Sequence, residues 1–118
     1  MIQQFTIHDW VPDALANVSG DHWRKREKKL KAAQIMVWAA AKQADIKPTL
    51  GRAKVTITLS FKLTRRRDTD NLYSRIKGVL DGLVKGGWIV DDSTDWLDLS
   101  VKSAKGELST CIEIESQE

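Results

Sequence analysis

Residues 53–64 constrain the fold more than any other part of the 118-residue chain. In this segment apolar side chains, from Ala53 to Leu63, alternate with lysine, threonine and serine. A period of two is the pattern of a β-strand that buries one face and leaves the other in contact with water. The segment therefore predicts a strand whose apolar face packs against another layer of the protein.

Two helices and three further strands are expected around this strand. Residues 21–44 lack glycine and proline and repeat apolar residues at helical spacing, and residues 70–85 do so until Gly86 ends the pattern. Shorter alternating runs predict strands near residues 5–8, 97–101 and 108–114. We therefore expect one α+β domain over residues 1–118, in the order β-α-β-α-β-β, with two helices on one face of a small mixed sheet.

The composition excludes several classes of protein. Cys111 is the only cysteine, so an internal disulfide and a cysteine-based zinc site are both impossible. No apolar run approaches the roughly 18 residues of a membrane span, and the first six residues lack the features of a signal peptide. We expect a cytoplasmic protein with no membrane partner, in which any metal would rely on oxygen ligands or on the two histidines.

Charge is segregated along the chain, although the formal net charge is only +3. Residues 20–67 carry 14 Lys and Arg against 3 acids, whereas residues 68–118 carry 5 against 11. A basic segment favours phosphate partners, and an acidic segment beside it suggests a bound cation. The basic residues of the first helix, among them Arg24, Lys25 and Lys28, could also form only a solvated face.

Asp68 and Asp70 are the main candidates for a metal site. They lie two residues apart between the strand and the second helix, so both side chains point the same way if the chain there is extended. Paired carboxylates suit a hard cation such as Mg²⁺. The three arginines 65–67 directly before them would suit a phosphate. Either aspartate could instead only cap the helix.

Further candidates follow along the chain. On a helical wheel Asp70, Lys77 and Asp81 share one stripe opposite the apolar face, and Arg75 lies off that stripe. Lys77 and Asp81 could also form only a surface ion pair. Asp91-Asp92 would bring a third carboxylate if the apolar run before it forms a strand beside residues 53–64, or it could form only a turn.

These residues together resemble a known family. The pattern consists of Arg65-Arg66-Arg67-Asp68-Thr69-Asp70-Asn71-Leu72, Lys77, Asp81-Gly82-Leu83 and Trp88-Ile89-Val90-Asp91-Asp92. It resembles the RusA family of Holliday-junction resolvases, found in bacteria and their prophages. Asn17 and His22-Trp23-Arg24 look like the early loop of that family, and the expected order of elements also agrees.

What the resemblance implies is an endodeoxyribonuclease that depends on Mg²⁺, with Mn²⁺ as an alternative, and makes paired nicks in four-way DNA junctions as a homodimer. Asp68, Asp70 and Asp92 would be metal-binding carboxylates, with Asp91 as the alternative third ligand. Lys77 would be the catalytic basic residue, although the lysine follows the D-N pair more closely in the best-known members. DNA would be held by Arg65, Arg66, Arg67, Asn71, Arg24, Lys25 and Lys28. The expected location is the cytoplasm of a bacterial or phage-infected cell.

Two other functions fit the same residues. The chain could bind branched or duplex DNA without cutting it, with the acids serving as helix caps. It could also be a metal-dependent nuclease that acts on other DNA structures. Replacing Asp68 or Asp70 distinguishes the first alternative, because only a nuclease would lose cleavage.

Overall fold

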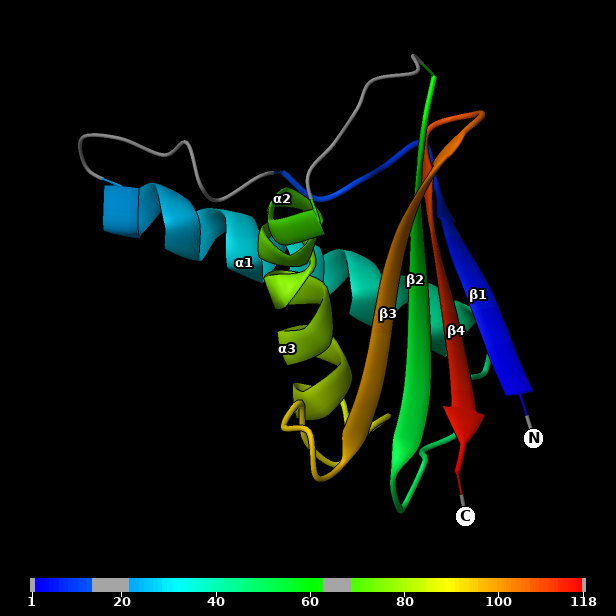
Figure 1. Cartoon of the computed structure of the whole chain (residues 1–118). Coiled ribbons are helices and arrows are strands. Elements are labelled where there is room, and N and C mark those ends of the chain that lie inside the picture. Colours follow the sequence, from blue (N-terminus) through cyan, green and yellow to red (C-terminus); the bar gives the residue numbers. More distant parts are fainter. Residues whose placement is uncertain (1, 14–21, 63–68, 118) are drawn as a thin grey trace.

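The computed structural model describes residues 2–13, 22–62 and 69–117. It forms an α+β fold in which three helices lie on one side of a four-stranded mixed sheet (Figure 1). The strands are β1 (Ile2–His8), β2 (Ala53–Phe61), β3 (Leu97–Lys105) and β4 (Ser109–Ser116). The helices are α1 (His22–Gln43), α2 (Thr69–Arg75) and α3 (Lys77–Lys85). The predicted α+β class and mixed sheet are confirmed.

The sheet has the strand order β1-β4-β2-β3. β2 pairs in parallel with β3 and antiparallel with β4, and β1 pairs antiparallel with β4. Alternate residues of β2 are buried, as the period of two predicts, and Lys54 on the other face is exposed. The helices cover the apolar face and enclose the core, which includes Val55, Ile57, Leu59, Val37, Val79, Leu83, Ile112 and Ile114.

The prediction of a single second helix is wrong, because that segment forms two helices that meet at Ile76. The backbone at Ile76 has φ −94° and ψ 3°, outside the usual helical range. Its N–H donates to the carbonyl of Tyr73, three residues back, at 3.3 Å. The side chain of Ile76 is only 1% exposed. The helix therefore breaks at a residue that is packed in the core. The apolar residues of the segment nevertheless keep helical spacing across the break.

α1 and α3 approach each other closely at two glycines of α3. A Cβ atom on Gly78 would lie 2.8 Å from Cβ of Ala33, and one on Gly82 would lie 3.1 Å from Cα of Gln34. The indole Nε1 of Trp38 donates to the carbonyl of Gly82 at 2.8 Å. The absence of two side chains therefore lets the two helix backbones come together.

The Trp38 hydrogen bond leads to a stability prediction. Trp38→Phe removes the donor while it keeps an aromatic ring, so one hydrogen bond is lost across the α1–α3 contact. We expect the free energy of unfolding to fall by about 1 kcal/mol, measured by urea denaturation. An unchanged urea concentration at the unfolding midpoint, with an unchanged dependence of the free energy on urea, would contradict a stabilising role for this hydrogen bond.

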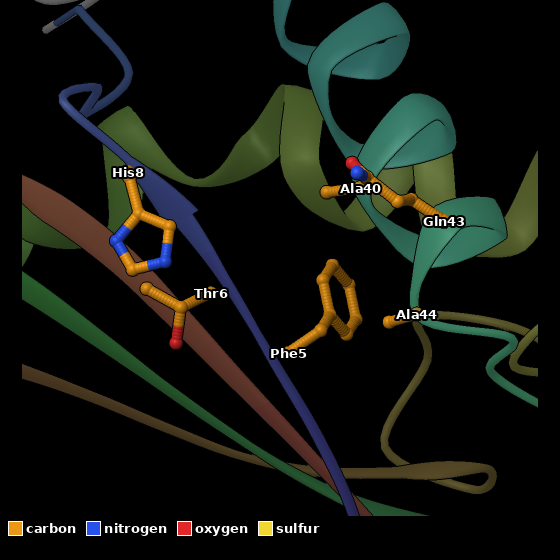
Figure 2. A pocket seen from close by; sticks show the side chains of 6 residues that line it. All are labelled: Phe5, Thr6, His8, Ala40, Gln43 and Ala44. Atoms are coloured by element: carbon orange, nitrogen blue, oxygen red, sulfur yellow. The ribbon is translucent and has the colours of Figure 1, made fainter.

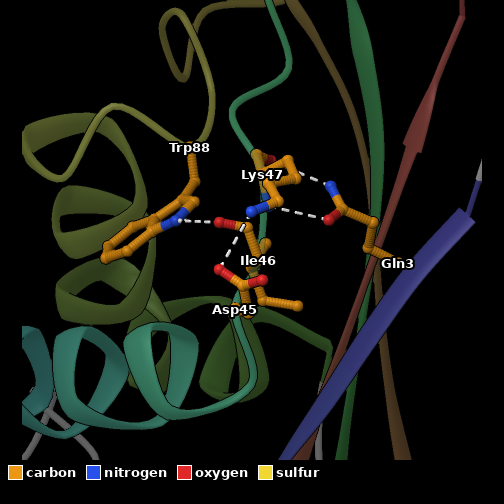
Figure 3. Close-up of polar contacts among 5 residues, drawn as sticks. All are labelled: Gln3, Asp45, Ile46, Lys47 and Trp88. Carbon is orange, nitrogen blue, oxygen red and sulfur yellow. Dashed lines mark hydrogen bonds and ion pairs between the residues drawn. The ribbon is translucent and has the colours of Figure 1, made fainter.

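Trp88–Val90 does not form the short strand considered from the sequence, because the backbone bends there. Trp88 is instead a buried anchor. Its indole Nε1 donates to the carbonyl of Ile46 at 3.0 Å, and its own carbonyl accepts from the N–H of Thr49 at 2.9 Å. Figure 3 shows this contact beside the two hydrogen bonds that join the amide of Gln3 to the backbone of Lys47. These contacts tie the chain between α1 and β2 to the segment after α3.

Candidate active site

The predicted acidic pair belongs to the connection between β2 and α2. Asp70 is in the first turn of α2, which places its backbone after the carboxyl end of β2. Asp68 and the arginines 65–67 lie outside the described residues, as do the side chains of Asp70 and Asn71. Their roles as metal ligands and phosphate contacts stay predictions. The early-loop residue Asn17 and the side chains of His22 and Trp23 also lie outside this part of the chain.

Arg75 joins α2 to two other parts of the molecule. Its Nη1 donates to the carbonyl of Pro12 at 2.9 Å, and its guanidinium carbon lies 5.6 Å from the centre of the Phe61 ring. Sequence reasoning passed over Arg75 because it lies off the acidic stripe. On the helical wheel Arg75 lies beside the apolar face, and this position indicates from the sequence that its side chain points inward.

Lys77 and Asp81 do not act as a pair. Lys77 is exposed in the first turn of α3, and no ion pair joins it to Asp81 in the described structure. Asp81 is half-buried and lines a small groove against α1. Because the helix breaks at Ile76, the acidic stripe expected from a continuous wheel is divided between α2 and α3.

The segment that carries Asp91 and Asp92 is attached near the start of β2. Both flanks of this segment are bound near the start of β2, since Trp88 pairs with Thr49 and the carbonyl of Trp96 accepts from the N–H of Ala53 at 3.0 Å. α2 is instead tied to Phe61, the last residue of β2. β2 itself is about 26 Å long, at 3.3 Å for each residue step from Ala53 to Phe61. In Figure 1 the connection that follows α3 lies near the lower end of the sheet, and α2 lies above α3.

No group of three histidine, cysteine or acidic residues that could hold a metal ion occurs among the described residues. The carboxylates of the predicted ligands Asp68 and Asp70 lie outside this part of the chain. Their chemistry nevertheless fits Mg²⁺, which binds one or two protein carboxylates and retains several waters. A third protein ligand is therefore not a requirement of the metal itself.

The first half of α1 carries the predicted basic surface. Arg24, Lys25 and Lys28 are all exposed, and no acidic residue lies in the first turn of this helix. The positive charges therefore face solvent, where a phosphate backbone could reach them. In the described ranges no helix is both long and apolar enough to cross a membrane.

A separate groove of about 280 Å³ lies between β1 and the second half of α1 (Figure 2). Its lining is mostly small or apolar, with Phe5 at the base and His8 as its one titratable side chain. It contains no carboxylate or basic cluster, so nothing in it matches the chemistry expected of the acidic pair.

A comparison with known protein families shows to which family the chain belongs. The family model described as endodeoxyribonuclease RusA matches residues 12–115. The chain belongs to the RusA family. No curated protein matches at the level required for a significant relationship. Membership in the RusA family implies an endodeoxyribonuclease that resolves Holliday junctions, and the match includes α1, the acidic pair and Asp91-Asp92.

Proposed function

We propose that this RusA-family protein resolves four-way DNA junctions by metal-dependent hydrolysis of phosphodiester bonds. The observation that carries the proposal is the family match over residues 12–115. It is supported by the order of the chain at the predicted site, where three arginines and Asp68 lie between β2 and α2 in the sequence and Asp70 is in the first turn of α2.

In this proposal Asp68 and Asp70 hold Mg²⁺ or Mn²⁺ beside the scissile phosphate. The bound cation would activate the attacking water and offset charge on the leaving oxygen. Lys77, exposed at the start of α3, would stabilise negative charge on the phosphoryl oxygens. The arginines 65–67, together with Asn71 and the exposed basic residues of α1, would bind the DNA backbone without reading its sequence.

The test is cleavage of a labelled mobile four-way junction with Mg²⁺, with Mn²⁺ and with EDTA, beside a linear duplex and a flap substrate of the same sequence. We expect paired nicks in the junction alone and none in EDTA. Binding without nicks in any metal would leave a DNA-binding module. Equal cleavage of flaps and junctions would instead favour a nuclease of broader structural selectivity.

We further propose that the active protein is a homodimer, because two symmetric nicks require two active sites. We propose that Asp92, as a third carboxylate ligand, comes from the partner chain, because its segment is attached near the start of β2 whereas Arg75 of α2 contacts Phe61 at the end of β2. The end of the sheet that carries Asp92 also exposes Leu50, Val90 and Trp96. Exposed apolar side chains of this size are typical of a surface that contacts another protein.

Subunit complementation tests this shared site. Asp70→Asn and Asp92→Asn chains are each expected to be inactive alone. Mixed after unfolding and refolding, they would form heterodimers in which one site has both aspartates intact, so single nicks in the junction should return. Inactive mixtures that contain heterodimers would instead place both aspartates of each site in one chain. An active Asp92→Asn protein would remove Asp92 from the site.

The basic surface of α1 leads to a prediction about salt. Lys25→Gln combined with Lys28→Gln removes two exposed charges. If both contact phosphates, the slope of log K against log salt for junction binding should become shallower by about 2. Lys42→Gln with Lys54→Gln, also exposed but elsewhere on the chain, is the matched control. Equal slopes for the two double variants would contradict a DNA contact by this part of α1.

A further inference from the structure

We propose that Arg75 is a positioning residue for the active site, a role that rests on the proposed nuclease function. Its contacts lie at the end of β2 from which the predicted acidic pair follows. The inference concerns how α2, which carries Asp70, is held in place rather than any contact between Arg75 and DNA.

Three segments that are distant in sequence meet at Arg75. Pro12 belongs to the segment after β1 and is 63 residues away, while Phe61 ends β2. Both partners are buried, and the guanidinium group is itself partly buried. A planar guanidinium can donate a directed hydrogen bond while its face lies over an aromatic ring. Arg75 therefore links α2 to both segments through two different interactions.

The segment that contains Pro12 is fixed independently. The N–H of Asp9 donates to the carbonyl of Leu108 at 2.8 Å, and the hydroxyl of Thr110 donates to the carbonyl of Trp10 at 2.9 Å. Thr110 is fully buried in β4. The carbonyl of Pro12, which accepts from Arg75, therefore belongs to a segment that is attached to the sheet. The hydrogen bond from Arg75 thus holds α2 in place relative to the sheet.

The length of α2 limits how firmly it can be held on its own. It contains seven residues, so it has fewer than two full turns to stabilise it, and among its described side chains, those of residues 72–75, Leu72 is the one in the buried core. α2 also ends at Arg75, before the helical break at Ile76, so it is not continuous with α3. Loss of Arg75 should therefore allow α2 to shift, and a shift of about 1 Å at a catalytic group can cost roughly 100-fold in rate.

The test compares two variants. Arg75→Met keeps most of the side-chain length but removes the positive charge, and Arg75→Lys keeps the charge and one donor nitrogen. We expect Arg75→Met to lower kcat by roughly 30- to 100-fold, to raise the Mg²⁺ concentration needed for half-maximal cleavage, and to leave junction Kd within about twofold. Arg75→Lys should recover part of the loss. Trp38→Phe, which removes a hydrogen bond between α1 and α3, is the control for a loss of stability away from α2.

Hydrogen exchange gives a readout that does not require cleavage. Arg75→Met should speed exchange of the amides of α2 and of residues 9–13, whereas exchange in α1 and α3 should stay as in the wild type. Unchanged exchange in α2 would overturn the positioning role, as would an unchanged kcat at temperatures well below unfolding. A weaker junction Kd with normal kcat would show a DNA contact instead. A wild-type protein that fails to cut junctions would overturn the proposed function, and the catalytic part of this inference with it.

Discussion

Asp70→Asn is expected to lower the rate of junction cleavage by about 1,000-fold or more, because the substitution removes a charged ligand of the proposed metal site. Asparagine has the same size as aspartate, and because Asp70 is already in the first turn of α2, only a charge interaction with the helix N-terminus, worth less than about 1 kcal/mol, would be lost. The stability of α2 should therefore be largely retained. Junction affinity should be equal or higher, since a negative charge near the phosphates is lost. Single-turnover cleavage and gel-shift binding measure the two effects separately.

This substitution separates the two interpretations of Asp70. If the carboxylate serves only to favour the N-terminus of α2, Asp70→Asn and Asp70→Ala should both leave cleavage unchanged and reduce stability by less than about 1 kcal/mol. Asp81→Asn is the matched control, because Asp81 lies on α3 and lines a groove against α1. Full cleavage by Asp70→Asn would exclude Asp70 from the metal site.

Gly78→Val is expected to have the largest effect on stability. The new Cβ would lie 2.8 Å from Cβ of Ala33 and 3.0 Å from the carbonyl oxygen of Leu30. Neither atom can rotate away, because one is fixed to the backbone and the other belongs to it. α1 and α3 would have to separate, at a cost of about 3 kcal/mol. Thermal unfolding should then occur roughly 10 °C lower.

Gly106→Ala is the control for Gly78→Val. No atom lies within 4 Å of a Cβ placed on Gly106, so its stability should change by less than about 0.5 kcal/mol. Gly78→Ala should fall between the two, since better helix propensity offsets part of the clash. Equal unfolding temperatures for Gly78→Val and the wild type would mean that the helices are farther apart in solution than the structure has them.

The local periods of the sequence predicted most elements correctly. Residues 53–64 alternate because one face of β2 is buried against helices, and residues 21–44 have helical spacing because one side of α1 faces the core. Such patterns are local consequences of burial, so they can be read without knowledge of the neighbours. The prediction of one helix over residues 70–85 was wrong because a break at Ile76 leaves the apolar spacing unchanged.

The candidate site was predictable only in part. The D-x-D-N pattern and the basic residues before it are features of the sequence, and they are what the resemblance to the RusA family used. The hydrogen bond of Arg75 to Pro12 and the attachment of the segment that carries Asp92 near the start of β2 were not predictable in this way. Both depend on contacts between residues far apart in the chain.

The sequence by itself determined the strand and helix content, the segregation of charge and the family, because each follows from the order of residues within short segments. The tertiary structure decided how those segments meet. It set the close approach of α1 and α3 at Gly78, the attachment of α2 through Arg75 and the attachment of the segment after α3 near the start of β2. The physical reason is that packing depends on which surfaces fit together, and the same periodic pattern is compatible with many arrangements of its neighbours.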